Sequence, residues 1–180
     1  MKQDFVYTRT MVAKNPAANS TAPKIIIGLG NPGRRYENTY HNAGYWFIEY
    51  LEKNFAGKLQ SVKILKTDCF MNNSGGFVKE VIRRGGLTPS ELLIAHDDSD
   101  IEIGKIKLSF GSGAAGHRGI ENIIEVLGTA DFWRLRIGIR PKEKPDRPRL
   151  KAETFVLKKI SWRHKIVLRN SFKKSVALLE

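Results

Sequence analysis

Hydrophobic residues follow two different spacings along this chain. Short apolar runs at 24–29, 62–66 and 91–96 predict buried strands, and 105–110 and 134–139 alternate polar with apolar residues as half-exposed strands do. Between these runs, apolar residues recur every three or four positions, which predicts helices. The predicted helical faces are Phe47, Ile48, Leu51 and Phe55; Phe77, Val78, Val81 and Ile82; Ile120, Ile123, Ile124 and Leu127; and Leu168, Phe172, Val176 and Leu179.

Capping residues suggest where these helices begin and end. The first helix is expected from Gly44, and the second has Ser74 as a candidate N-cap and ends at 85–86. The third runs from about His117 to Gly128, and the last begins near Ser161. Strands that alternate with helices predict one three-layer α/β domain, with a mixed, mostly parallel twisted sheet flanked by helices. We assign residues 24–180 to this domain and 1–23, which lack a sustained period, to a flexible N-terminal tail.

Two segments, "GLGNPG" from Gly28 and "GSGAAG" from Gly111, match the G-x-G-x-x-G fingerprint of dinucleotide-binding loops. The first lacks the helix that should follow at once, because Pro32 and a polar run delay it. The second lies between a strand and a helix, but no acidic residue ends a following strand at the required spacing. Its glycines also suit a loop whose backbone N–H groups approach a phosphate. The sequence therefore argues against a dinucleotide-dependent oxidoreductase, and we expect no cofactor.

The charge of the chain favours a polyanionic partner. Lys and Arg number 31 and Asp and Glu 18, which gives a net charge of +13. Twelve basic and four acidic residues fall in 141–180, so this segment carries much of the excess. Such a segment attracts nucleic acid by counterion release. No apolar stretch is long enough for a membrane helix and no secretory signal is evident, so we expect a cytoplasmic protein. Cys69 is the single cysteine, so we expect no structural zinc site.

Four segments carry a more specific pattern: "GLGNPGRRYENTYHNAGYWFI", "CFMNNSGGFV", "LLIAHDDSDIEIGKIKLSFGSGAAGHRGIENII" and "FWRLRIGI". In this order they resemble bacterial peptidyl-tRNA hydrolase over roughly residues 24–175. The resemblance implies an enzyme that hydrolyses the ester between a stalled peptide and the 3′ end of tRNA, without a metal. It also implies peptidyl-tRNA as the partner and no membrane association, and we expect a monomer.

The residue types fit ester hydrolysis. His41 has the ordinary pKa of a base at neutral pH, and Asp97, placed after a buried strand, can orient its ring. The amides of Asn31 and Asn72 can donate hydrogen bonds to a carbonyl oxygen or hold the peptide. Singly, Asn31 could be a turn former and Asn72 a helix cap, but the set favours the catalytic interpretation.

The resemblance and the charge predict two further sets of contact residues. Residues expected to contact the substrate are Tyr36, Met71, Asn72, His117 and Arg118. Residues expected to contact tRNA are Lys105, Lys107, Arg140, Lys142, Arg163, Lys173 and Lys174. Recognition should be mainly of backbone and shape, because duplex RNA hides its base edges in a deep, narrow groove.

The chain departs from the family pattern at three places. Arg118 stands where the family usually has Asn, and it can donate but not accept a hydrogen bond. Tyr40 replaces a common Arg, and the segment between Phe55 and Met71 is short, which predicts a smaller sheet with an altered edge. Arg118 and the high charge leave a second interpretation open: a non-catalytic RNA-binding homologue of the same fold, like the chloroplast intron-splicing homologue.

Overall fold

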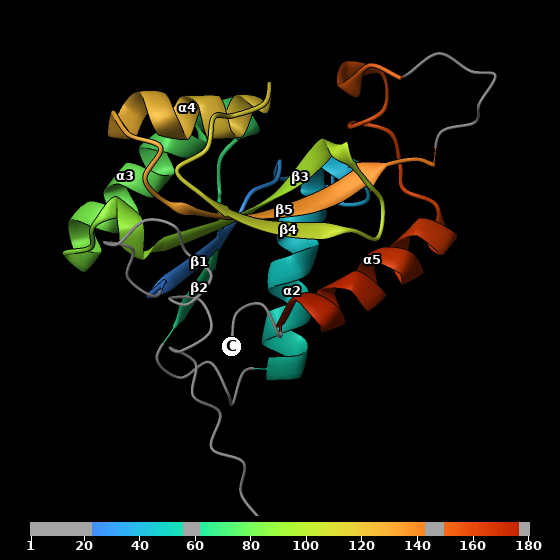
Figure 1. Ribbon diagram of the computed structural model, residues 1–180, viewed down its shortest axis with the longest axis horizontal. Coiled ribbons are helices and arrows are strands. Elements are labelled where there is room, and N and C mark those ends of the chain that lie inside the picture. Colours follow the sequence, from blue (N-terminus) through green and yellow to red (C-terminus); the bar gives the residue numbers. More distant parts are fainter. Residues whose placement is uncertain (1–22, 56–61, 143–149, 177–180) are drawn as a thin grey trace, which may run out of the picture.

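The computed structural model describes residues 23–55, 62–142 and 150–176, where strands and helices alternate (Figure 1). The strands are β1 (Ile25–Gly28), β2 (Lys63–Lys66), β3 (Leu92–Glu102), β4 (Ile106–Phe110) and β5 (Trp133–Arg140). The α-helices are α2 (Ala43–Phe55), α3 (Ser74–Gly85), α4 (Arg118–Leu127) and α5 (Trp162–Val176). Four 3-10 helices in these ranges are η1 (Tyr40–Asn42), η2 (Met71–Asn73), η3 (Pro89–Glu91) and η4 (Ala152–Thr154).

The five strands form one sheet in the order β2-β1-β3-β5-β4. β2, β1, β3 and β5 are parallel, and β4 joins β5 as an antiparallel edge strand. α2 and α5 lie on one side of this sheet, and α3 and α4 lie on the other (Figure 1). The predicted three-layer architecture with a mixed, mostly parallel sheet is therefore confirmed.

Alternate residues of the central strands fill two separate cores. Ile26 of β1 packs into the core beneath α2 and α5, whereas Ile25 and Ile27 pack into the core beneath α3 and α4. β3 repeats the pattern, with Leu93 in the first core and Ile94 in the second. Because side chains alternate across a strand, a continuous apolar run is what a sheet covered on both faces requires.

The glycines of the first fingerprint permit close packing. A Cβ on Gly28 would meet the backbone of Gly44 in α2, and a Cβ on Gly44 would overlap the carbonyl oxygens of Leu29 and Ala95. The start of α2 can therefore lie directly on the ends of β1 and β3. This close contact with α2 is a structural role for Gly28.

Two local predictions are wrong. β3 does not end at His96 but continues to Glu102, because β5 pairs with it through Asp98 and again at Glu102 after a register shift. Asp97 and its neighbours thus belong to a strand rather than to a loop. Ser74 does not cap α3 but is its first residue, and its hydroxyl donates to the carbonyl of Met71.

Some expectations fall outside the described ranges. They include almost all of the N-terminal tail and Leu179, so the boundary between tail and domain stays a prediction. The short segment between Phe55 and Met71 contains β2, which is one edge strand of the sheet. Within the described ranges, no helix is both long and apolar enough to span a membrane.

Candidate active site

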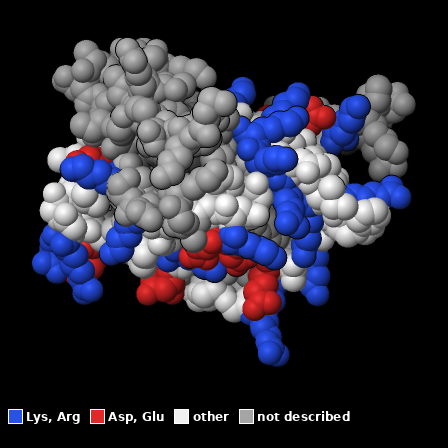
Figure 2. All heavy atoms as spheres, turned by 90° about the horizontal axis from the view of Figure 1, so that it is seen from below, with Lys and Arg blue, Asp and Glu red and all other residues white. Residues whose placement is uncertain are grey.

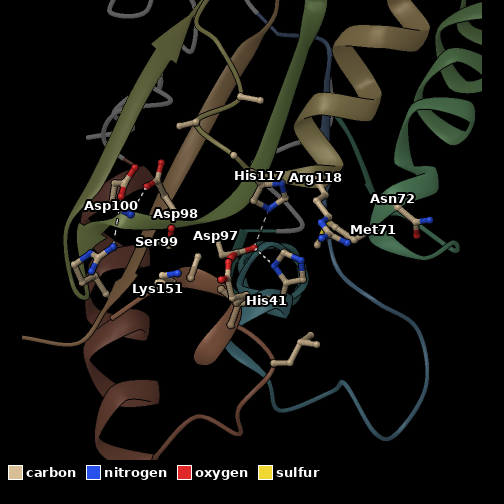
Figure 3. A pocket seen from close by; sticks show the side chains of 18 of the residues that line it. His41, Met71, Asn72, Asp97, Asp98, Ser99, Asp100, His117, Arg118 and Lys151 are labelled. Carbon is tan, nitrogen blue, oxygen red and sulfur yellow. Dashed lines mark hydrogen bonds and ion pairs between the residues drawn. The ribbon is translucent and has the colours of Figure 1, made fainter. Parts of the chain in front are cut away.

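A cavity of about 900 Å³ opens near the carboxyl ends of the parallel strands. β1 ends at Gly28, which pairs with Ala95, so Asp97 lies beyond the end of β1 even though β3 continues. The cavity wall brings together seven of the eight residues that the sequence assigned to catalysis or to substrate contact: Asn31, His41, Met71, Asn72, Asp97, His117 and Arg118. They come from the β1 loop, η1, η2, β3 and the start of α4, and all but Asn31 are labelled in Figure 3.

Two imidazole rings converge on one carboxylate oxygen. Oδ1 of Asp97 lies 2.8 Å from Nδ1 of His41 and 3.0 Å from Nε2 of His117 (Figure 3). The Asp97 side chain is only 2% exposed, and the two rings are hydrogen-bond partners of its Oδ1. When Nδ1 of His41 donates to Asp97, the lone pair of Nε2 is available to accept a proton.

The surroundings of the pair shift both pKa values. Burial of the ring lowers the pKa of His41, but the charge of Asp97 and its hydrogen bond outweigh burial, so the pKa lies above the ordinary value. The charge of Arg118 acts against Asp97 and lowers the pKa of His41. Burial would raise the pKa of Asp97, but the charges and hydrogen bonds of both histidines hold it far below its usual range. Asp97 is therefore an anion that raises the pKa of the base beside it.

His117 is held in one tautomer by the helix that it caps. Its Nδ1 accepts a hydrogen bond from the backbone N–H of Ile120 in the first turn of α4, at 3.3 Å. Nε2 must then carry the proton that is donated to Asp97. His41, Asp97 and His117 are close enough to one another to be considered as a metal site. The hydrogen bonds place a proton on Nε2 of His117, so a metal could bind that nitrogen only by displacing the proton. His41 and His117 are thus joined through hydrogen bonds to the same carboxylate oxygen of Asp97.

The amide of Asn31 has a fixed orientation. Its Oδ1 accepts from the backbone N–H of Met71 at 2.8 Å, and its backbone N–H and carbonyl bond to the side chain of Asn42 at 2.9 and 3.0 Å. Because the oxygen is occupied, Nδ2 is left as a donor on the cavity wall. Gly119 also matters here, since a Cβ would lie 2.6 Å from Sδ of Met71, so glycine lets this side chain of η2 lie directly against the start of α4.

Two further donors and an apolar wall complete the cavity. Asn72 and Arg118 are exposed, and neither side chain has a hydrogen-bond or ion-pair partner in the described chain. Phe70, Leu150 and Leu157 line the cavity although about half of each side chain is exposed to solvent. The arrangement offers a base, an anion that orients it, amide donors and an apolar surface, which is a set suited to hydrolysis of an ester that carries an apolar group.

Comparison with known proteins agrees with this geometry. The family model for peptidyl-tRNA hydrolase matches residues 25–180. The chain belongs to the peptidyl-tRNA hydrolase family. A relative from Coxiella burnetii (strain CbuG_Q212) is 39% identical over 169 residues, which cover 87% of this chain and 88% of the relative. One from Thiobacillus denitrificans is 41% identical over 136 residues, which cover 68% and 67%. The crystal structure of the Acinetobacter baumannii peptidyl-tRNA hydrolase has a TM-score of 0.75 at 29% identity and covers 91% of this chain and 89% of its own.

Two further residues selected from the sequence are Tyr36, expected to contact the substrate, and Arg140, expected to contact tRNA. Tyr36 is half-buried outside the cavity wall, with its ring edge-on to Phe70 at 6.0 Å. Arg140 lines the cavity, but its side chain is buried and donates to the carbonyl of Leu150 and to Asp100, so it differs from a surface cation.

The other cations expected to contact tRNA are exposed: Lys105, Lys107, Lys142, Arg163, Lys173 and Lys174. Lys105 forms an ion pair with Glu102 at 2.8 Å. Arg163, Lys173 and Lys174 lie on α5, which also exposes Lys165 and Arg169. Figure 2 views the molecule from below Figure 1, and Lys and Arg side chains gather over the part of this face that α5 forms. We call these five residues of α5 the basic face.

Sequence reasoning missed several residues that shape this peptidyl-tRNA hydrolase site. Asn42 fixes Asn31, and its place in "HNAG" beside His41 was the available signal. Arg136 holds Asp98 through a 2.7 Å ion pair, which no local pattern indicated. His96 lies edge-on behind His117 at 4.7 Å, and burial lowers its pKa well below the ordinary value, so it supports that ring as a neutral group.

Proposed function

We propose that this protein hydrolyses the ester bond between the peptide and the tRNA in peptidyl-tRNA, releasing tRNA for reuse. The observation that carries the proposal is the 2.8 Å contact between Nδ1 of His41 and the buried carboxylate of Asp97, on the wall of a cavity that also holds free amide donors. Membership of the peptidyl-tRNA hydrolase family supports the same substrate.

In the proposed reaction, Nε2 of His41 takes a proton from a water molecule, whose oxygen attacks the ester carbonyl. Asp97 stabilises the imidazolium that forms and keeps Nε2 directed at the water. The carbonyl oxygen becomes an oxyanion, which the amides of Asn31 and Asn72 can stabilise by hydrogen bonds. Breakdown of the tetrahedral intermediate breaks the bond to the 3′ oxygen of the terminal ribose. His41 returns its proton to that oxygen, so the products are a free peptide acid and tRNA.

The walls of the cavity suit the two parts of this substrate. Phe70, Leu150 and Leu157 offer apolar surface to the side chains of the peptide. Met71 and His117, with Arg118, surround the ester end, where we place the substrate contacts expected from the sequence. The basic face of α5, with Lys105, Lys107 and Lys142, is assigned to the phosphates of the tRNA.

The proposal includes the setting in which the enzyme works. We infer that it needs no metal, because the proton on Nε2 of His117 and the hydrogen bonds to Asp97 use the atoms that a metal would bind. We infer a monomer, because one chain supplies the base, its orienting carboxylate and the amide donors. We infer the cytoplasm, because peptidyl-tRNA arises at the ribosome.

The proposal is tested by incubating the protein with a tRNA esterified to a labelled, N-blocked peptide and measuring release of the peptide. The native protein should release it, and His41→Ala should lower kcat by about 10²–10⁴-fold, because a general base contributes that much. Binding is measured in parallel with an analogue that joins peptide to tRNA by an amide, and His41→Ala should bind it as tightly as the native protein.

Failure of the native protein to release peptide would refute the proposal. If it bound the amide-linked analogue without hydrolysing the ester, the RNA-binding homologue would be the better description. The paired His41 and Asp97 speak against that alternative, because binding alone needs no base with an orienting carboxylate.

A further inference from the structure

The segment that leads to His41 is held by the chain before α5. Thr39 forms an isolated antiparallel bridge with Lys159, and the backbone N–H of Ile160 donates to the carbonyl of Asn38 at 2.8 Å. The backbone N–H of His41 itself donates to the carbonyl of Val156 at 2.9 Å. The position of the base in η1 therefore depends on a segment more than one hundred residues further along the chain.

One side-chain hydrogen bond also joins η1 to α5. The hydroxyl of Tyr40 lies 2.6 Å from Nδ1 of His164, in the first turn of α5. The Tyr40 ring is 7% exposed and lies edge-on to Phe155 at 6.1 Å. Burial raises the pKa of Tyr40, so the hydroxyl keeps its proton and donates, and Nδ1 of His164 accepts.

Tyr40 and His41 are neighbours in a 3-10 helix and project in different directions. Successive residues of such a helix are about 120° apart, so the chain can direct Tyr40 toward α5 while His41 reaches the cavity. Any rotation of η1 moves both rings together. The hydrogen bond to His164 opposes such a rotation together with the backbone contacts, because it holds the far end of the Tyr40 side chain.

We propose that Tyr40 and His164 are a positioning pair that holds His41 in its catalytic orientation by tying η1 to the first turn of α5. This inference rests on the proposed hydrolysis, in which His41 is the base. Neither residue lines the cavity, so both act through His41 rather than on the substrate.

The test compares Tyr40→Phe, which removes only the hydroxyl, with two variants of the half-exposed His164. His164→Leu removes the acceptor. His164→Asn keeps one, because Oδ1 of Asn occupies nearly the place of Nδ1. Displacement of a catalytic group by about 1 Å can cost about 100-fold, and removal of one hydrogen bond should displace His41 by less. We therefore expect Tyr40→Phe and His164→Leu to lower kcat on peptidyl-tRNA about 10-fold with KM unchanged.

His164→Asn should restore kcat to within about two-fold of the native value, because the acceptor is kept. The double variant Tyr40→Phe/His164→Leu should be no slower than Tyr40→Phe alone, because the hydroxyl that His164 binds is already absent from that variant. Tyr50→Phe is the matched control: it removes a hydroxyl from a half-buried ring of α2, outside the active-site cavity, and should leave kcat unchanged.

Several results would overturn the inference. One is an unchanged kcat per folded molecule with a lowered Tm, which would make the contact structural only. Another is a raised KM with kcat unchanged, which would make His164 an RNA contact. A third is a His164→Asn variant as slow as His164→Leu. All three require that the native protein hydrolyses peptidyl-tRNA; if it does not, the proposed function has failed rather than the pairing alone.

Discussion

Replacement of Asp97 by Asn should separate its electrostatic role from its role in the fold. The substitution keeps the size of the side chain and an oxygen that can still accept from His41 and His117, and it removes the negative charge. We expect kcat/KM on peptidyl-tRNA to fall about 100- to 1,000-fold while the protein remains folded. We also expect the acid limb of the pH profile to move to lower pH.

The magnitude follows from the distances. Oδ1 of Asp97 is 2.8 Å from Nδ1 of His41, which places the two charge centres roughly 4 Å apart. Unit charges at that separation interact by about 4 kcal/mol at an effective dielectric constant of about 20. Each 1.36 kcal/mol added to the barrier costs about ten-fold in rate, so the ceiling is roughly 10³-fold. The amide oxygen of Asn retains part of the interaction with the imidazolium, which sets the lower end of the expected range.

The direction of the pH shift follows from the causes of the pKa of His41. The base must be neutral to accept a proton, so kcat/KM rises with pH through that pKa. In the native protein Asp97 holds it above the ordinary value. In Asp97→Asn, burial and the charge of Arg118 remain, and both lower it. The variant should therefore be slower wherever the base is neutral in both proteins, and yet lose activity at a lower pH than the native protein.

The assay is kcat/KM measured across the range in which histidine titrates, with Tm measured on the same preparations. Asp131→Asn is the matched control, because Asp131 is exposed and outside the cavity wall, and its profile should match that of the native protein. The reasoning is refuted if Asp97→Asn keeps its kcat/KM per folded molecule, or if its acid limb stays in place or moves to higher pH.

Two further predictions concern charge. Arg118→Asn should raise the pKa of His41, because a positive charge that lowers it is removed, so the acid limb should move to higher pH; kcat should rise and tRNA affinity should weaken. Equal profiles and affinities for the two proteins would show that Arg118 faces solvent only. Lys173→Gln/Lys174→Gln should weaken tRNA binding and reduce the slope of log K against log salt by about 0.7–0.9 for each phosphate that the variant no longer neutralises. An unchanged slope in a salt titration would exclude these lysines from the interface.

The sequence was sufficient for the elements and for much of the chemistry. Apolar spacing located the strands and helices, because an element that is buried on one or both faces has apolar residues at regular, local intervals. The residue types and the family resemblance selected His41, Asp97, Asn31 and Asn72, which the fold brings to one cavity wall. Apolar spacing failed where polar residues continue a strand: β3 runs past Asp98 because that carboxylate is paired with Arg136 of β5. A local pattern cannot contain that partner.

What the sequence alone determined is therefore the architecture, the family pattern and the types of residue at the site. What only the tertiary structure decided is how these residues meet. The strand order and the crossing of α2 over β1 bring His41 against Asp97 across 56 positions, and Tyr40 against His164 across 124. The tautomer of His117 and the orientation of Asn31 likewise depend on the N–H groups of Ile120 and Met71. The apolar pattern around a residue in the sequence indicates whether its side chain is buried. The hydrogen bonds that set its protonation and orientation are made with segments that are distant in the sequence and come close only in the folded protein.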